Sequence, residues 1–439
     1  MRRNLNSTLP IALTANLLEW YEFAISGFMA LTIGKLFFPA SGNKAALIAS
    51  FSVFATSYLA RPIGSVFFGI WADKRGARAA LTLSLILMAV PTALIAFLPT
   101  YETAGYLATG VLLVLRILHG FAAGGELPIS AYYVSLNTSE KNRGFYCSLV
   151  SLSTLLGVLL ASGVMLVLPS VASKISAMLP GGVIPGHLGE VWRWPFLLSI
   201  PLSLWVLRIR ASMPVTTVDK LLTPRIPFGR PVAPLLQAAV LVAFLQLNFY
   251  TVFFWLPNYL YSYLDVWGPD VSESNSIGLA VLTISIFCTG YATRRIDASK
   301  LLLTGVVGLL VSSYPLFSVL QGGAFLSLVL AQSAFAVMEG LIYGTIFIVL
   351  ADLFAENWKS LGMTMGFTVP TAFVGGTAPV VCTYLIEWFD VLAAPALYIV
   401  AMGLLAAPVA YYLAFRAKNQ KIRPERSRVE VGSQRLKPR

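Results

Sequence analysis

Charged residues, histidine and cysteine are all scarce in this chain of 439 residues. It contains 19 Asp and Glu, 31 Lys and Arg, 2 His and 3 Cys. Its charged fraction is 11%, against about 25% in an ordinary soluble domain. Hydrophobic residues make up 57%, more apolar surface than a water-soluble chain of this length can bury. The composition excludes a cytosolic enzyme, a disordered protein and a small disulfide scaffold.

The few cysteines and histidines form no recognisable metal or disulfide pattern. The cysteines lie far apart in apolar stretches, no CxxC pair occurs, and His119 and His187 have no metal-ligand spacing. A structural zinc site or a disulfide framework is therefore not expected. The motifs HExxH, GxSxG and GxxxxGK followed by Ser or Thr are missing as well. We expect neither an enzyme nor an ATP-driven pump, and we expect no cofactor or bound metal.

Long apolar runs dominate the chain instead. Because a helix needs about 20 apolar residues to cross a bilayer, the apolar content suffices for about twelve spans. The sequence predicts an all-α membrane protein with twelve transmembrane helices in two six-helix bundles. The predicted spans are residues 9–34, 45–71, 79–98, 104–136, 145–168, 192–210, 233–263, 274–293, 300–319, 323–352, 359–388 and 391–416.

Lys and Arg are distributed unevenly between the two sides of these spans. Segments on the side of the N-terminus carry 25 of them, whereas the other side carries four: Lys35, Lys44, Lys174 and Arg193. By the positive-inside rule, both termini are expected in the cytoplasm. The net charge of +12 then faces anionic lipid headgroups, and no nucleic-acid partner is expected.

The longest hydrophilic interruption, residues 211–232, divides the chain into two parts. We expect an N-terminal bundle at 1–210, a cytoplasmic linker at 211–232 and a C-terminal bundle at 233–416. Two such bundles are typical of transporters built from repeats. The basic segment 417–439 is expected to be a solvated tail that fixes the topology, and a regulatory tail that responds to lipid is the alternative.

A charged loop after the second predicted span contains Gly69, Asp73, Lys74, Arg75, Gly76 and Arg78. Its spacing resembles the signature loop of the major facilitator superfamily. Gly76 permits a tight turn. Asp73 can lie at the positive N-terminus of a helix, and the resemblance suggests the helix that starts near residue 359. The corresponding loop of the second half has Arg294 at the Asp position. The charged contact between a loop of one bundle and a helix of the other is therefore expected only for the loop of the first half.

Further motifs lie along the chain: LEWYEF at 18–23, RPIG at 61–64, RILHG at 116–120, GGE at 124–126, RG at 143–144, WRWPF at 192–196 and GGTAP at 375–379. Together they resemble the metabolite:H⁺ symporter family, which includes bacterial proline/betaine, shikimate, citrate and α-ketoglutarate transporters. The resemblance implies a multi-pass protein of the bacterial cytoplasmic membrane that couples a small-molecule substrate to H⁺ by alternating access. We expect it to function as a monomer. The family usually has Asp where Glu22 stands and Gln where His119 stands.

Seven ionisable residues fall inside the predicted spans: Glu19, Glu22, Arg61, Arg116, His119, Glu126 and Glu339. Such groups are costly in a bilayer unless they are paired or hydrated, so each is a functional candidate. At 1.5 Å per helical residue, Glu19 and Arg61 lie at similar depth and can pair. Arg116 is the cation nearest in depth to Glu22. The alternative for each of these residues is a structural ion pair between helices. For Arg61 we prefer this alternative, and we group Arg61 with Arg143 and the signature loop as structural or gating residues.

Glu22 is predicted to carry the coupled proton, with Glu19, His119 and Glu126 as further candidates. A carboxyl group in a low-dielectric site holds its proton more readily, and a neighbouring arginine favours the ionised form. Opening to water, or substrate engaging Arg116, would shift that balance and release or capture H⁺. His119 can share this role because imidazole titrates near neutral pH, and a packed, hydrogen-bonded histidine is the alternative.

The second half offers aromatic residues and one acid for substrate binding. Tyr250, Phe253 and Trp255 lie in a run whose aromatic residues surround the helix, so some are expected to face lipid and others the cavity. Glu339 lies one turn from Tyr343. We hypothesise a zwitterion site in which Arg116 holds a carboxylate, while Glu339 and the aromatic rings hold an ammonium group.

The alternative for these residues is packing and a helix–helix hydrogen bond. The alternative functions are import of a carboxylate such as citrate, α-ketoglutarate or shikimate, and, less favoured, export. Because both in-span arginines lie in the first half, a substrate with one carboxylate is preferred over a di- or tricarboxylate.

Overall fold

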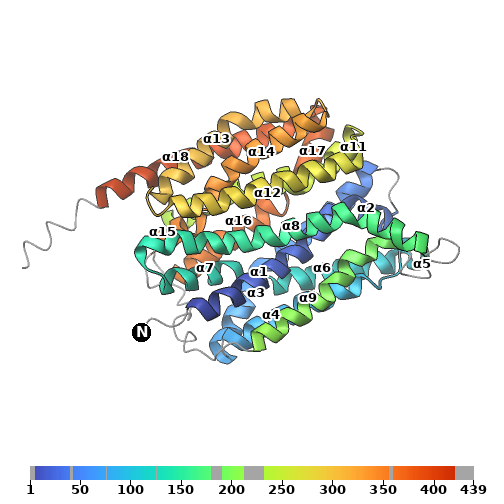
Figure 1. Cartoon of the computed structure of the whole chain (residues 1–439), viewed down its shortest axis with the longest axis horizontal. Helices are drawn as coiled ribbons and strands as arrows, with labels where there is room; N and C mark the ends of the chain where they lie inside the picture. The colour runs from blue at the N-terminus through green and yellow to red at the C-terminus, as the bar shows by residue number, and fades with distance from the viewer. Residues whose placement is uncertain are drawn as a thin grey trace, which may run out of the picture.

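The computed structural model describes residues 5–39, 43–75, 77–124, 126–178, 190–211, 232–354 and 359–420. These residues form helices joined by short connections, and they contain no strand. Most helices lie side by side along the long axis of the molecule (Figure 1). The predicted linker, apart from its two end residues, and most of the predicted tail lie outside the described residues.

We call described residues 5–211 the N-half. Its helices are α1 (Leu5–Phe28), α2 (Ala30–Phe37), α3 (Asn43–Arg75), α4 (Ala77–Ile95), α5 (Tyr101–Ala104), α6 (Tyr106–Ala122), α7 (Glu126–Asn137), α8 (Glu140–Met178), the 3₁₀ turn η3 (Val191–Arg193) and α9 (Trp194–Ala211).

We call described residues 232–420 the C-half. It contains two π-helical turns, η5 and η6, inside longer helices. Its helices are α10 (Ala233–Phe249), η5 (Tyr250–Trp255), α11 (Leu256–Tyr263), α12 (Gly268–Ala292), α13 (Ala298–Leu320), α14 (Phe325–Tyr343), α15 (Ile346–Leu353), α16 (Lys359–Pro370), η6 (Thr371–Gly375), α17 (Ala378–Phe389) and α18 (Ala394–Gln420).

Helix is found in every range for which the sequence predicts a span. Within the described residues, nine helical stretches are long and apolar enough to cross a membrane. The chain is thus an all-α, multi-pass membrane protein, as the sequence predicts. The number of crossings and the side on which the termini lie stay predictions.

The predicted span 104–136 is not one helix, because α6 ends at Ala122 and α7 starts at Glu126. The chain lies very close to α3 at this break: a Cβ atom on Gly124 would lie 2.3 Å from the Arg61 carbonyl oxygen. Glu126 is the first residue after this break. The break puts this acid in the first turn of α7, where the helix dipole favours negative charge.

Two further glycines set the crossing of α3 and α6. A Cβ atom on Gly120 would lie 1.8 Å from the Ser57 carbonyl oxygen, and one on Gly64 would lie 1.7 Å from the Phe121 carbonyl oxygen. Only a residue without a side chain fits at either position, as is common where membrane helices pack closely. This close approach brings the buried polar residues of α3 and α6 into the same region of the N-half.

The helical stretch Ala233–Tyr263 is the most buried of the nine. Phe249, Tyr250, Phe253, Phe254 and Trp255 are each at most 1% exposed. The expectation that some of these aromatics face lipid is therefore wrong. Helices α1, α14, α16, α17 and α18 pack around α10 and η5, so the rings meet other helices on every side.

The two halves touch along α8, from its start to beyond its middle, and α8 packs against α12 of the C-half. Near the start of α8, Arg143 forms an ion pair with Asp352 of α15. Further along, the Ser162 hydroxyl oxygen lies 2.7 Å from that of Ser276 on α12. The two contacts are about 28 Å apart along α8 at 1.5 Å per residue, so the halves are joined at two distant levels.

Candidate functional site

Glu22 lies buried inside the N-half within a shell of hydrogen-bonding side chains. Its Oε2 accepts from the Thr92 hydroxyl of α4 at 3.2 Å, and its Oε1 accepts from the Ser203 hydroxyl of α9 at 3.3 Å. The same Thr92 oxygen lies 2.9 Å from Nδ1 of His119 on α6. The carboxyl group is therefore held directly by side chains of two other helices, and Thr92 links it to a third.

Thr92 bridges the two titratable groups of this cluster. Nδ1 of His119 is 3.8 Å from Oε2 of Glu22, too far for a direct hydrogen bond, and the threonine hydroxyl lies between them. A hydroxyl donates one proton and accepts others, so Thr92 can donate to Glu22 while it accepts from His119. The arrangement can pass a proton between Glu22 and His119 through Thr92.

Arg116 belongs to the same region. It is 3% exposed, its guanidinium carbon lies 5.8 Å from the centre of the Phe196 ring, and its charge acts on Glu22. Arg116 and Glu22 are therefore close enough to interact electrostatically, and the prediction that Arg116 is the cation nearest to Glu22 stays a prediction. Among the described residues, Nη2 of Arg116 has no hydrogen-bond partner.

Glu19 and Arg61 form the ion pair that their depths predict. Nη2 of Arg61 lies 3.5 Å from Oε1 of Glu19, and both side chains are buried. The guanidinium carbon lies 4.1 Å from the centre of the Phe23 ring, 4.3 Å from that of Tyr58 and 5.8 Å from that of Trp20. Arg61 is thus enclosed by aromatic rings as well as paired with an acid.

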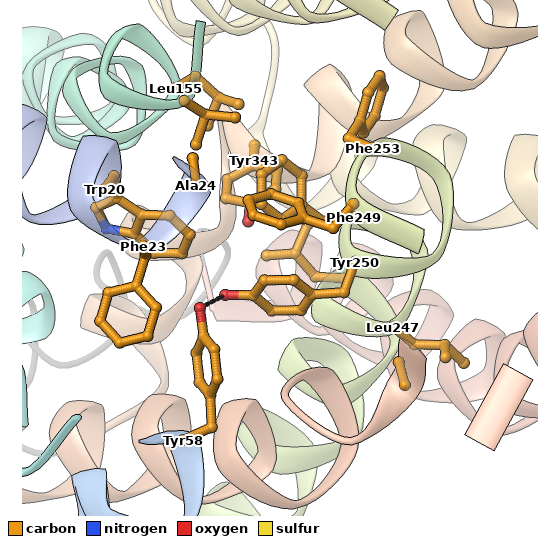
Figure 2. Close-up of a cluster of buried hydrophobic side chains, with 14 of the residues drawn as sticks. Trp20, Phe23, Ala24, Tyr58, Leu155, Leu247, Phe249, Tyr250, Phe253 and Tyr343 are labelled. Carbon is orange, nitrogen blue, oxygen red and sulfur yellow. Dashed lines mark hydrogen bonds between the residues drawn. The ribbon is translucent and has the colours of Figure 1, made fainter. Parts of the chain in front are cut away.

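An aromatic cluster joins the two halves beside this pair (Figure 2). Tyr58 of α3 and Tyr250 of η5 share a hydrogen bond between their hydroxyl groups. The ring of Trp20 meets that of Phe249 at a centroid distance of 6.0 Å. Two of the aromatic residues predicted to bind substrate hydrogen-bond to the N-half: Tyr250 through its hydroxyl group, and Tyr343 through its backbone carbonyl, which accepts from Ser151 of α8 at 2.8 Å.

The side chains of Tyr343 and the other predicted aromatics have partners inside the C-half. Tyr343 donates to Oε1 of Gln246 at 2.7 Å, and Trp255 donates from Nε1 to Thr383 at 2.9 Å. The ring of Phe253 packs against α12, where a Cβ atom on Gly278 would lie 3.3 Å from it. These contacts order the C-half side of the aromatic cluster.

Glu339 is buried on α14 one turn from Tyr343, as the sequence predicts. Within the described residues, its Oε1 has no hydrogen-bond partner. No hydrogen bond or ion pair among the described side chains joins Glu339 to Arg116. The zwitterion site in which a substrate joins Arg116 to Glu339 stays a prediction.

The predicted gating residues are described only in part. Arg143 is paired with Asp352 across the halves. Gly76 lies outside the described residues, and the side chains of the rest of the signature loop are not described: Gly69, Asp73, Lys74, Arg75 and Arg78. Their roles stay predictions.

Sequence reasoning missed Thr92, Ser203, Tyr58 and Asp352. Thr92 follows Pro91, and Ser203 comes two residues after Pro201. Proline inside a membrane helix leaves backbone groups that nearby hydroxyls often satisfy, so a polar residue beside such a proline was the available signal. Nothing in the sequence marks Tyr58 or Asp352 above their neighbours.

Known transporters resemble this chain over most of its length. The family model described as "Sugar (and other) transporter" matches residues 8–217. The Proline/betaine transporter of Escherichia coli (strain K12) is 25% identical over 424 residues, which cover 91% of this chain and 82% of the relative. The Ectoine/proline transporter ProP of Corynebacterium glutamicum is 27% identical over 412 residues, 89% of this chain and 80% of the relative.

Solved structures share the fold at lower identity. The E. coli xylose transporter XylE, in a partially occluded inward-open conformation, matches with a TM-score of 0.68 at 15% identity and covers 92% of this chain and 96% of its own. The major facilitator superfamily proton:xylose symporter XylE, bound to 6-bromo-6-deoxy-D-glucose, matches with a TM-score of 0.70 at 16% identity, with 93% and 95% covered.

The chain is similar to membrane transporters in sequence, and it shares its fold with solved transporters of the major facilitator superfamily. Its curated relatives are transporters of proline, betaine and ectoine rather than enzymes. They agree with the resemblance to the metabolite:H⁺ symporter family that the sequence motifs indicate.

Proposed function

We propose that this chain is a proton-coupled symporter that imports a small zwitterionic metabolite, such as proline, betaine or another amino acid. The observation that carries the proposal is Glu22, a carboxyl group buried among Thr92, Ser203 and His119. Ionisable groups inside a membrane bundle mark proton pathways. The relatives named as proline and betaine transporters support the choice of substrate.

Glu22 carries the transported proton in this proposal. When it is protonated it is neutral, and when it is ionised its charge is balanced by the nearby Arg116. Thr92 and His119 form the path by which the proton moves to and from the carboxyl group. Glu19 and Glu126 remain further candidates for proton transfer, and no bound cofactor takes part.

Alternating access supplies the transport step. The two halves are six-helix bundles of a twelve-span protein with both termini in the cytoplasm, and they act as one monomer in the bacterial cytoplasmic membrane. The Arg143–Asp352 pair and the Ser162–Ser276 contact join the halves at two levels along α8. Breaking one while keeping the other opens the region between the halves to one side only.

Uptake into proteoliposomes tests the proposal. Purified protein is reconstituted, an inward H⁺ gradient is imposed, and labelled proline, glycine betaine, other amino acids, citrate, α-ketoglutarate and shikimate are offered in turn. We expect accumulation of one or more zwitterions, and its collapse when a protonophore is added. Accumulation of carboxylates alone would overturn the zwitterion assignment, and accumulation that persists with the protonophore would overturn the coupling to H⁺.

A further inference from the structure

We propose that the Glu19–Arg61 pair, together with the rings of Trp20, Phe23 and Tyr58, is the site that binds the two charges of the substrate. The substrate carboxylate takes the place of Glu19 at Arg61, and its ammonium group takes the place of Arg61 at Glu19 and the rings. This inference rests on the proposed import of a zwitterion, and it names the residues that recognise it.

The surroundings of Arg61 are those of a cation-binding cage. Three rings lie 4.1, 4.3 and 5.8 Å from its guanidinium carbon, and the side chain is only 6% exposed. Aromatic faces attract quaternary and primary ammonium groups as well as guanidinium. A substrate ammonium that displaced Arg61 would meet the same rings and the same carboxylate.

Arg61 also has hydrogen-bonding capacity that the described residues do not use. Its Nε and Nη2 are buried and have no hydrogen-bond partner among the described residues. Nε1 of the neighbouring Trp20 is a third such donor. Buried donors without acceptors are costly, and a carboxylate can accept from a guanidinium through both of its oxygens. The missing partner of Arg61 therefore has the chemistry of a carboxylate.

The spacing of the pair favours a compact zwitterion. Nη2 of Arg61 and Oε1 of Glu19 are 3.5 Å apart, so the two protein charges are neighbours. An α-amino acid or a betaine carries its opposite charges on groups separated by one carbon. Such a molecule can meet both residues at once, head to tail, without separating them widely.

The pair lies where both halves can respond to a bound molecule. Tyr58, one wall of the cage, is hydrogen-bonded to Tyr250 of the C-half, and Trp20 contacts Phe249. Arg116, in contrast, contacts Phe196 and acts on Glu22, and both of these lie in the N-half. Arg61 is therefore better placed than Arg116 to hold the substrate carboxylate, which leaves Arg116 to the proton site.

A structural ion pair is the competing explanation, and a double substitution separates the two. Removing one partner of a buried ion pair is strongly destabilising, whereas replacing both with neutral groups is often tolerated. If the pair were structural, Glu19→Gln/Arg61→Gln would regain the stability and transport that either single variant loses. If the pair binds substrate, the double variant folds but stays inactive.

Binding of labelled L-proline and glycine betaine to wild type, both single variants and the double variant is measured with thermal unfolding of the same samples. We expect each single variant to bind these zwitterions about 10- to 100-fold more weakly, as for loss of a charge-assisted hydrogen bond. The double variant should unfold near the wild-type temperature without regaining affinity. Recovery of zwitterion binding by the double variant would overturn the inference.

Competition by analogues that carry a single charge measures how each variant changes the affinity for one charge of the substrate. A purely structural role of the pair would not change the two analogue affinities in opposite ways. Cyclopentanecarboxylate keeps the carboxylate of proline, and pyrrolidine keeps its ammonium. Glu19→Gln should weaken the binding of pyrrolidine and proline but leave that of cyclopentanecarboxylate unchanged. Arg61→Gln should weaken the binding of cyclopentanecarboxylate but leave that of pyrrolidine unchanged. Equal loss of both analogues in each variant would overturn the inference.

Arg193 provides the matched control. This buried arginine is paired with Glu190 at 3.0 Å and donates to the carbonyl oxygens of Ala96 and Leu98. Arg193→Gln should lower stability without changing the ratio of proline to cyclopentanecarboxylate affinity. If the proposed function is wrong, wild type accumulates no zwitterion. If only this inference is wrong, wild type still takes up zwitterions, and the ratios of analogue affinities are the same in the Glu19 and Arg61 variants as in wild type.

Discussion

The hydroxyl groups of Tyr58 and Tyr250 are hydrogen-bonded to each other across the interface between the N-half and the C-half. Both side chains are fully buried, and their ring centroids lie 5.1 Å apart. The bond connects α3, which carries Arg61, with η5 at the middle of the most buried helix. Separation of the halves at this level must break it.

Substitution of these tyrosines by phenylalanine should show that they act as a pair. Tyr58→Phe and Tyr250→Phe each leave one buried hydroxyl without its partner, and the double variant leaves none. We expect the double variant to be no less stable than either single variant, with a coupling free energy of about 0.5–1.5 kcal/mol. Thermal unfolding of the three variants measures this coupling, and additive losses would show that the hydroxyls are independent.

The sequence predicted the charged pairs better than their polar partners. Depth along a helix depends only on residue number, so it placed Glu19 level with Arg61 and Arg116 near Glu22. It could not select Thr92 or Ser203, because that choice depends on how each helix is rotated about its axis. Membrane helices give little pattern for rotation, since lipid-facing and protein-facing positions are equally apolar.

The same limit explains the error over Phe249 to Trp255. Hydrophobicity does not distinguish a ring that faces lipid from one that faces another helix. The π-helical turn η5 also changes the register of the residues from Tyr250 to Trp255, which no composition rule indicated. The break before Glu126 was missed for a related reason, because the close approach of Gly124 to α3 is a property of the packed structure.

Glu22→Gln should separate transport from proton coupling. Glutamine keeps the size of the side chain and can accept from Thr92 and Ser203, but it carries no titratable proton. We expect accumulation driven by a pH gradient to be lost and exchange of internal for external substrate to continue. Both are measured in proteoliposomes with labelled proline. Glu22→Asp, which retains a carboxyl group, is the control and should retain accumulation; accumulation by the glutamine variant would exclude Glu22 as the proton carrier.

Thr92→Val should slow net proton-coupled uptake more than exchange. Valine has the shape of threonine but lacks the hydroxyl that contacts Glu22 and His119. We expect net uptake to fall about tenfold, as for one lost hydrogen bond to a charged group, while exchange stays within about twofold. Thr92→Ser restores the hydroxyl and should restore net uptake. An equal fall in both rates for Thr92→Val would assign Thr92 to packing rather than to proton transfer.

Two glycines of α6 should respond in opposite ways to alanine. A Cβ atom on Gly120 would lie 1.8 Å from the Ser57 carbonyl oxygen, whereas one on Gly110 would meet nothing within 4 Å. Gly120→Ala should lower stability by about 1–3 kcal/mol because it overpacks the contact with α3. Gly110→Ala should leave stability unchanged or raise it slightly, since alanine favours helix. Thermal unfolding in detergent measures both, and equal unfolding temperatures would contradict the close crossing of α3 and α6.

Arg143→Gln should loosen the contact between the N-half and the C-half near the start of α8. Arg143 is paired with Asp352 across the halves, and Cys147, buried one turn further along α8, reports on opening there. The pair is partly exposed, with side-chain exposures of 26% and 58%. It should therefore contribute no more than about 1 kcal/mol, and its loss should speed labelling of Cys147 by about two- to fivefold.

The labelling is carried out with a water-soluble maleimide in a Cys288→Ser/Cys382→Ser background, so that Cys147 is the one thiol left. The charge-swapped variant Arg143→Asp/Asp352→Arg keeps an ion pair at the same place and should return the labelling rate toward that of the parent. If Arg143→Gln labels no faster than the parent, the ion pair does not hold the halves together. If the charge swap fails to restore protection while the protein remains folded, Arg143 acts through its packing instead of its charge.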